Sequence, residues 1–61
     1  MQTPKCYLST SRGEWRVILQ EMPLCADTTK ANAIKCAETF RVELAPVYWD
    51  GEAGDFKPLT N

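Results

Sequence analysis

The three cysteines are the most reactive side chains of this sequence, which contains no histidine. It therefore lacks the commonest general base and metal ligand that work near neutral pH. A serine or cysteine nucleophile without a neighbouring base is weak. Cys25 precedes a predicted helix start, where the helix macrodipole favours the thiolate, so it is the cysteine with a physical case for reactivity. We expect no catalytic residue and no enzyme activity.

The spacing of the potential ligands argues against a metal or phosphate site. Cys6, Cys25 and Cys36 lie far apart and form no C-x-x-C pair, which structural zinc sites usually contain. The acidic stretch 50–55 superficially resembles a calcium loop, but it lacks the glycine that such a loop needs at its sixth position. The three glycines fit no phosphate-binding fingerprint. We therefore expect no metal and no cofactor.

The cysteine count and the first residues predict a cytoplasmic protein. An odd number of cysteines is a poor disulfide framework, and residues 1–5 lack the apolar stretch of a secretory signal. All three cysteines are thus expected to be reduced thiols, most simply buried as small hydrophobic side chains. No apolar run approaches the roughly 18 residues of a membrane span. If the chain is encoded by a phage or prophage, its location is the cytoplasm of a bacterial host.

Length and composition predict one small globular domain over residues 1–61. Hydrophobic residues make up 44% of the chain and charged residues 25%, a balance typical of folded proteins. The formal net charge is −1, with the acidic excess towards the C-terminal end. A nucleic-acid-binding domain usually carries a basic excess, so the charge does not favour that class.

Alternation and turn residues predict a hairpin over residues 5–20. The turn falls around Gly13, and Trp15, Val17 and Leu19 point towards the core. Residues 21–26 are predicted to be a loop, because Pro23 cannot donate to a sheet ladder.

A helix follows, and then one or two strands. Asp27 or Thr28 is the expected cap of a helix over residues 30–41, whose end is left open between Arg41 and Ala45. Residues 47–49 form a strand before an Asp50-Gly51 turn, and residues 55–57 are a candidate fourth strand. The predicted class is α+β, a small antiparallel sheet with one amphipathic helix packed across it, in the order β-β-α-β. The predicted core comprises Tyr7, Leu8, Trp15, Val17, Leu19, Ile34, Phe40, Leu44, Val47, Trp49, Phe56 and Leu59.

Two surfaces are candidates for binding a partner. Strand alternation sends neighbouring Tyr48 and Trp49 to opposite faces, so one of them is expected on an open face beside acidic residues. The first candidate, a protein-binding site, comprises Tyr48, Trp49, Asp50, Glu52 and Asp55. The alternative is a nucleic-acid face on the hairpin, made of Lys5, Arg12 and Arg16 beside aromatic rings that can stack on bases.

Residues 15–44 also resemble the N-terminal domain of HicB-type antitoxins. In that family a strand is followed by a Pro-containing apolar loop, a Cys and a Thr-led, alanine-rich helix. The corresponding residues here are Trp15-Arg16-Val17-Ile18-Leu19, Glu21-Met22-Pro23-Leu24-Cys25, Thr28 and Ala33-Ile34-Lys35-Cys36-Ala37. The glycine that usually follows the proline in that family is absent here. The resemblance implies a class of small phage and prophage proteins.

These observations together predict a protein-binding module that inhibits or neutralises a larger partner. Anti-CRISPR and other anti-defence inhibitors and antitoxins are proteins of this kind. Small nucleic-acid-binding domains are the alternative class, and a homodimer is left open. Two Trp, two Tyr and two Phe are more aromatic surface than a core of this size can hide, and aromatic residues are the usual anchors of interfaces.

Overall fold

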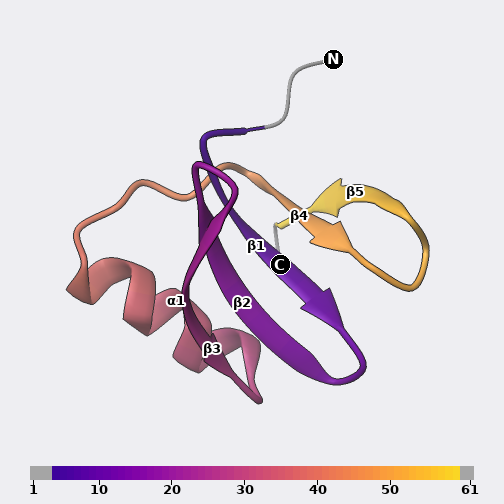
Figure 1. The fold of residues 1–61 in the computed structure, drawn as a ribbon, viewed down its shortest axis with the longest axis horizontal. Coiled ribbons are helices and arrows are strands. Elements are labelled where there is room, and N and C mark those ends of the chain that lie inside the picture. Colours follow the sequence, from indigo (N-terminus) through magenta and orange to yellow (C-terminus); the bar gives the residue numbers. More distant parts are fainter. Residues whose placement is uncertain (1–3, 60–61) are drawn as a thin grey trace.

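The computed structural model describes residues 4–59, so part of the segment 1–5, for which no secretory signal is predicted, lies outside the described residues. Five strands and one helix form the fold (Figure 1). Their bounds are β1 (Cys6–Ser11), β2 (Glu14–Leu19), β3 (Met22–Asp27), α1 (Lys30–Thr39), β4 (Val47–Asp50) and β5 (Asp55–Pro58). The predicted α+β class is confirmed. Within residues 4–59 no helix is long and apolar enough to cross a membrane.

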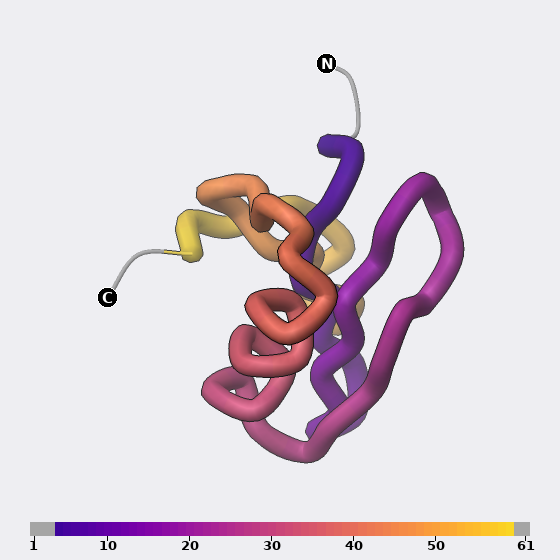
Figure 2. Tube along the Cα trace, turned by 90° about the vertical axis from the view of Figure 1, so that its left-hand side faces the viewer, coloured from indigo at the N-terminus to yellow at the C-terminus, as the bar shows by residue number. Residues whose placement is uncertain are grey.

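The sheet is mixed and has the strand order β3-β2-β1-β4-β5, so the predicted antiparallel β-β-α-β arrangement is wrong. β1 pairs with β4 in parallel, while the other neighbouring strands are antiparallel. Parallel neighbours need a crossover connection, and the chain supplies it with α1 and the segment that returns to the start of β4 (Figure 2).

β3 occupies a stretch that was predicted to be a loop because of Pro23. The proline lies on an edge strand, where the register with β2 shifts between Val17 and Ile18. A proline is tolerated at such a place, because an edge strand needs only one row of hydrogen bonds and a bulge already interrupts the ladder. The hairpin that joins β2 to β3 turns at Gln20 and Glu21, both with positive φ (50° and 67°).

The helix begins one residue after Thr29, whose hydroxyl oxygen accepts a hydrogen bond from the Asn32 N–H (3.2 Å). Thr29 is therefore the cap, and the prediction of Asp27 or Thr28 is wrong. The Asp27 carboxylate instead accepts hydrogen bonds from the Thr28 N–H (2.7 Å) and the Asn32 side-chain amide (3.2 Å). These bonds order the entry to the helix and hold the pKa of Asp27 below its ordinary value.

The helix ends at Thr39, earlier than the predicted range, in a Schellman motif. Phe40 is the C-cap, and Arg41 has the left-handed backbone conformation (φ 57°) that usually selects glycine. The Val42 N–H donates to the Ala37 carbonyl (3.1 Å) and the Arg41 N–H donates to the Glu38 carbonyl (3.0 Å). This motif reverses the chain before Pro46 can do so.

Replacing Arg41 by glycine should stabilise the fold by about 1 kcal/mol, because a residue with a Cβ is strained in the left-handed region. For a domain of this size the melting temperature should rise by roughly 4–8 °C. Arg41→Ala is the matched control, since it removes the same side chain but keeps the Cβ. An equal gain in both variants would contradict the backbone explanation.

The core lies between α1 and the facing side of the sheet. Its fully buried residues are Leu8 and Val17, each 0% exposed, and they pack with Cys6, Ala33 and Ala37. The predicted core is wrong at Phe40, which follows the helix and is 54% exposed. Because few side chains are buried, a covalent cross-link between the sheet and the helix is important for stability.

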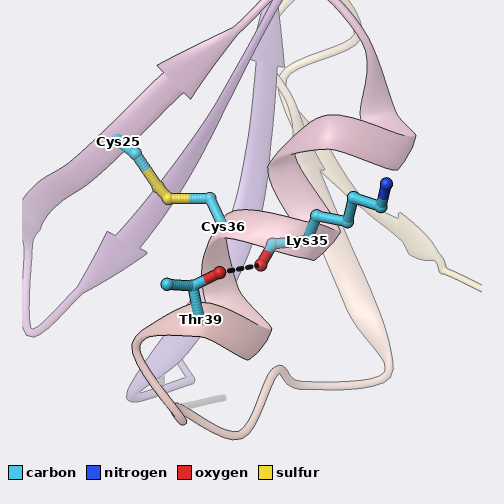
Figure 3. The surroundings of a disulfide bond; sticks show 4 residues. All are labelled: Cys25, Lys35, Cys36 and Thr39. Atoms are coloured by element: carbon cyan, nitrogen blue, oxygen red, sulfur yellow. Dashed lines mark hydrogen bonds between the residues drawn. A yellow bond between two sulfur atoms is a disulfide. The ribbon is translucent and has the colours of Figure 1, made fainter.

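A disulfide joins Cys25 of β3 to Cys36 of α1 (Figure 3), so the prediction of three free thiols is wrong. Cys25 pairs in register with Val17 and so lies on the side of the sheet that faces the helix. Strand and helix are thereby tied together across the core, and Cys25 is not available as the thiolate that its position before the helix would favour. Cys6 is the free cysteine; it is buried, and burial raises the pKa of its thiol.

Candidate functional site

One side of the sheet is not covered by any other part of residues 4–59. The helix packs against β2 and β3 on the side of Leu8 and Val17, and the segments after it contribute Val42, Leu44 and Leu59 to the same core. Side chains alternate along a strand, so the register assigns a second set to the opposite side. We call this side the open face; its residues are Tyr7, Ser9, Arg16, Ile18, Ala26, Val47, Trp49 and Phe56.

The two adjacent aromatics of β4 point to different sides, as strand alternation predicts. Tyr48 pairs with Leu8 on the core side, and its ring centroid lies 5.3 Å from that of Trp15. Trp49 pairs with Ser9 and lies on the open face. Of the two residues predicted together as binding residues, only Trp49 therefore belongs to this surface.

Three rings gather on the open face, and we call them the aromatic cluster: Tyr7, Trp49 and Phe56. The ring centroids of Trp49 and Phe56 are 5.1 Å apart, and those of Tyr7 and Phe56 are 5.5 Å apart, both in edge-on geometry. All three are half-buried. The three rings, and Val47 of the same face, were predicted to lie in the core, so the predicted core is wrong at these positions too. The Asp50-Gly51 turn could have predicted the contact between Trp49 and Phe56, because these residues face each other across the hairpin that this turn closes.

The acidic turn after β4 is built around Asp50, whose carboxylate has structural partners. It accepts hydrogen bonds from the Glu52 N–H (3.0 Å) and the Ala53 N–H (3.2 Å), and it forms an ion pair with Lys57 (3.2 Å). The two N–H groups, followed by Lys57, hold the pKa of Asp50 below its ordinary value. Asp50 thus anchors the turn, and it pairs with Thr10 on the core side of the sheet.

The other two predicted acidic residues are exposed on the same turn. The Glu52 carboxylate accepts a hydrogen bond from the Arg12 N–H (3.3 Å), which joins the acidic turn to the β1–β2 turn. Gly51 lies in the same junction, where an added Cβ would be 3.0 Å from both Ser11 Cβ and the Thr10 carbonyl oxygen. The two turns therefore form one edge of the open face. Asp55 pairs with Asp50 and so belongs to the opposite side of the sheet, where it is exposed.

A polar groove of about 450 Å³ lies beside the aromatic cluster. Its lining residues are Ser9, Ser11, Arg12, Glu14 and Arg16. Two of these residues are small serines, and the Arg16 guanidinium is ion-paired with Glu14. Of the predicted nucleic-acid residues, Arg12 and Arg16 meet here, whereas Lys5 lines a separate hollow with Leu19 and Val42.

Within residues 4–59, no three metal-ligating side chains converge. No protein-family model, curated protein or solved structure matches the chain. The case for function therefore rests on the open face itself: an aromatic cluster, a polar groove beside it and a rim with charges of both signs.

Proposed function

We propose that this protein is a protein-binding module that inhibits or neutralises a larger partner, and that the open face is its docking surface. The observation that carries the proposal is the aromatic cluster on a sheet face that no other part of residues 4–59 covers. Aromatic rings that are partly exposed on such a face are the usual anchors of protein interfaces.

The rim of the face supports a protein partner. Arg16 is paired with Glu14, and Glu52 contacts the backbone of Arg12, so basic and acidic groups lie next to one another along the groove and the adjoining turns. A mixed rim suits a protein surface, which presents charges of both signs. Antagonism of the partner, as in anti-defence inhibitors and antitoxins, remains a prediction based on small size and the lack of a catalytic constellation in the sequence, and the resemblance to HicB-type antitoxins remains a prediction too.

Affinity capture from a nuclease-treated bacterial lysate tests the proposal. The unaltered protein should retain a specific protein, and Trp49→Ala should reduce that recovery at least tenfold. Phe40→Ala is the matched control, because it removes an exposed aromatic ring that lies after the helix, away from the open face. Recovery that is unaffected by Trp49→Ala, or that falls equally in Phe40→Ala, would contradict the proposal.

The groove favours one alternative, the binding of single-stranded nucleic acid. Arg12 and Arg16 line the groove, and Trp49 lies in the same row as Arg16 with Ser9 between them, so a phosphate could bind in the groove while a base stacks on the ring. Titration with labelled single strands at low and moderate salt separates the two functions. A salt-sensitive affinity that is lost in Arg12→Ala/Arg16→Ala would support nucleic-acid binding. If the protein does not bind the strands even at low salt, nucleic-acid binding is excluded.

The sequence predicts a cytoplasmic location, and the Cys25–Cys36 disulfide argues against it. Disulfides persist in oxidising compartments and are rare in the cytosol. Alkylation of free thiols in intact cells before lysis tests the location: protection of Cys25 and Cys36 points to an oxidising compartment, and labelling of both supports the cytoplasm.

A further inference from the structure

The open face is built symmetrically around β1, the middle strand of the five. Two strands lie on each side of it, and the register aligns one residue from every strand in a single row across the face. From edge to edge this row reads Ala26, Arg16, Ser9, Trp49 and Phe56. A small residue stands in the middle and at one end, a large ring at the other end.

This row is complementary to itself. Consider a second copy placed face to face with the first and related to it by a two-fold axis that runs parallel to β1, midway between the two sheets. β2 of the second copy then lies opposite β4 of the first, and β3 of the second lies opposite β5 of the first. Phe56 then faces Ala26, a large side chain against a small one. Trp49 faces Arg16, an indole ring against a guanidinium, which is the most favourable cation–aromatic combination. The two Ser9 residues meet at the axis, where small side chains permit close approach.

The neighbouring row across the open face, which contains Ile18, Tyr7 and Val47, is complementary to itself in the same way. Tyr7 pairs with Ile18, and Val47 precedes Trp49 by two residues and so shares its face. In the same arrangement Val47 of one copy faces Ile18 of the other, an apolar pair, and the two Tyr7 rings meet near the axis. Complementarity between a patch and itself is what a two-fold interface requires.

We propose that two copies of this chain pack open face against open face as a two-sheet sandwich related by an axis along β1. The inference rests on the proposed function, because it assigns an occupant to the same docking surface. A net charge of −1 per copy opposes association only weakly. The fully buried core holds few side chains, and small domains commonly gain stability by oligomerisation.

The sandwich also covers the groove. Arg16 enters the interface already paired with Glu14, so its charge is not left without a partner when water is excluded. Stacked sheets lie about 10 Å apart, a distance that rings and long side chains fill. In this state a larger partner must displace one copy to reach the aromatic cluster.

A swap of side-chain size tests the arrangement by sedimentation over a range of protein concentrations. The unaltered protein should dimerise. Ala26→Phe should weaken dimerisation at least tenfold, because it sets ring against ring at both edges. Adding Phe56→Ala in the same chain should restore dimerisation, since the large and small residues then exchange places. Ala26 is exposed on an edge strand, so its replacement leaves the fold intact.

Two further variants keep the result decisive. Arg16→Glu should weaken dimerisation, because it places a carboxylate against the indole ring, while Phe40→Ala should leave dimerisation unchanged. A wild-type monomer at every concentration overturns the proposal, as does a double variant no tighter than Ala26→Phe alone. A monomer whose capture of a protein partner still depends on Trp49 overturns the dimer and leaves the proposed function standing.

Discussion

Replacing Cys25 and Cys36 together by alanine should lower the free energy of unfolding by about 3 kcal/mol, because the cross-link joins residues 11 apart and restricts the unfolded chain. For a domain of this size the melting temperature should fall by more than roughly 10 °C. The loss is large for this chain, because few side chains are fully buried and the bond ties α1 to an edge strand.

Thermal unfolding with and without a dithiol reductant measures this effect. Reductant should lower the melting temperature of the unaltered protein to that of the double variant, and it should not change the double variant itself. The buried Cys6 should not take part in exchange, because burial raises the pKa of its thiol and limits access. An unaltered protein whose melting temperature is insensitive to reductant would contradict the cross-link.

Tyr48→Ala and Trp49→Ala should differ in stability although the residues are adjacent. Tyr48 faces the core beside Leu8 and Trp15, so its truncation should lower the free energy of unfolding by about 3 kcal/mol. Trp49 faces the open side, and its truncation removes mainly the edge-on contact with Phe56. This loss should lower the free energy of unfolding by about 1 kcal/mol.

Chemical denaturation of the two variants measures the difference. Trp49→Ala is expected to stay folded at room temperature, so a loss of partner capture in this variant would be assigned to the surface and not to unfolding. Equal losses of stability would mean that Trp49 is as much a core residue as Tyr48, and the open face would then lose its central anchor.

The elements with a clear local signal were predictable from the sequence. The alternation of Trp15, Val17 and Leu19 gave the inward face of β2 correctly, and Val17 is fully buried. The Asp50-Gly51 signal marked the β4–β5 turn, and the predicted helix begins at Lys30 as expected, although it ends at Thr39. In each case neighbouring residues along the chain determine the structure.

The features that depend on distant contacts were not predictable in this way. β3 carries a proline, and its hairpin turns at Gln20 and Glu21, neither of which is a usual residue for positive φ. Only pairing with β2 makes that segment a strand. The parallel contact of β4 with β1 likewise depends on where the crossover returns, which local patterns do not specify.

The candidate site was predicted in part. Strand alternation required one of Tyr48 and Trp49 to leave the core, and the structure assigns that place to Trp49. Phe56 could have been placed beside Trp49 from the Asp50-Gly51 hairpin, but the contribution of Tyr7 could not be predicted, because the sequence does not show that β1 lies next to β4. The disulfide was missed because an odd cysteine count gives no pairing, while the fold brings Cys25 and Cys36 together.

The most direct test of the account is photo-crosslinking in bacterial cells with a benzophenone amino acid placed either at Phe56, on the open face, or at Phe40, after the helix. The account predicts nuclease-resistant crosslinks to protein from position 56 and at most weak ones from position 40. Crosslinks that disappear with nuclease, or that form equally at both positions, would contradict the claim that the open face binds protein.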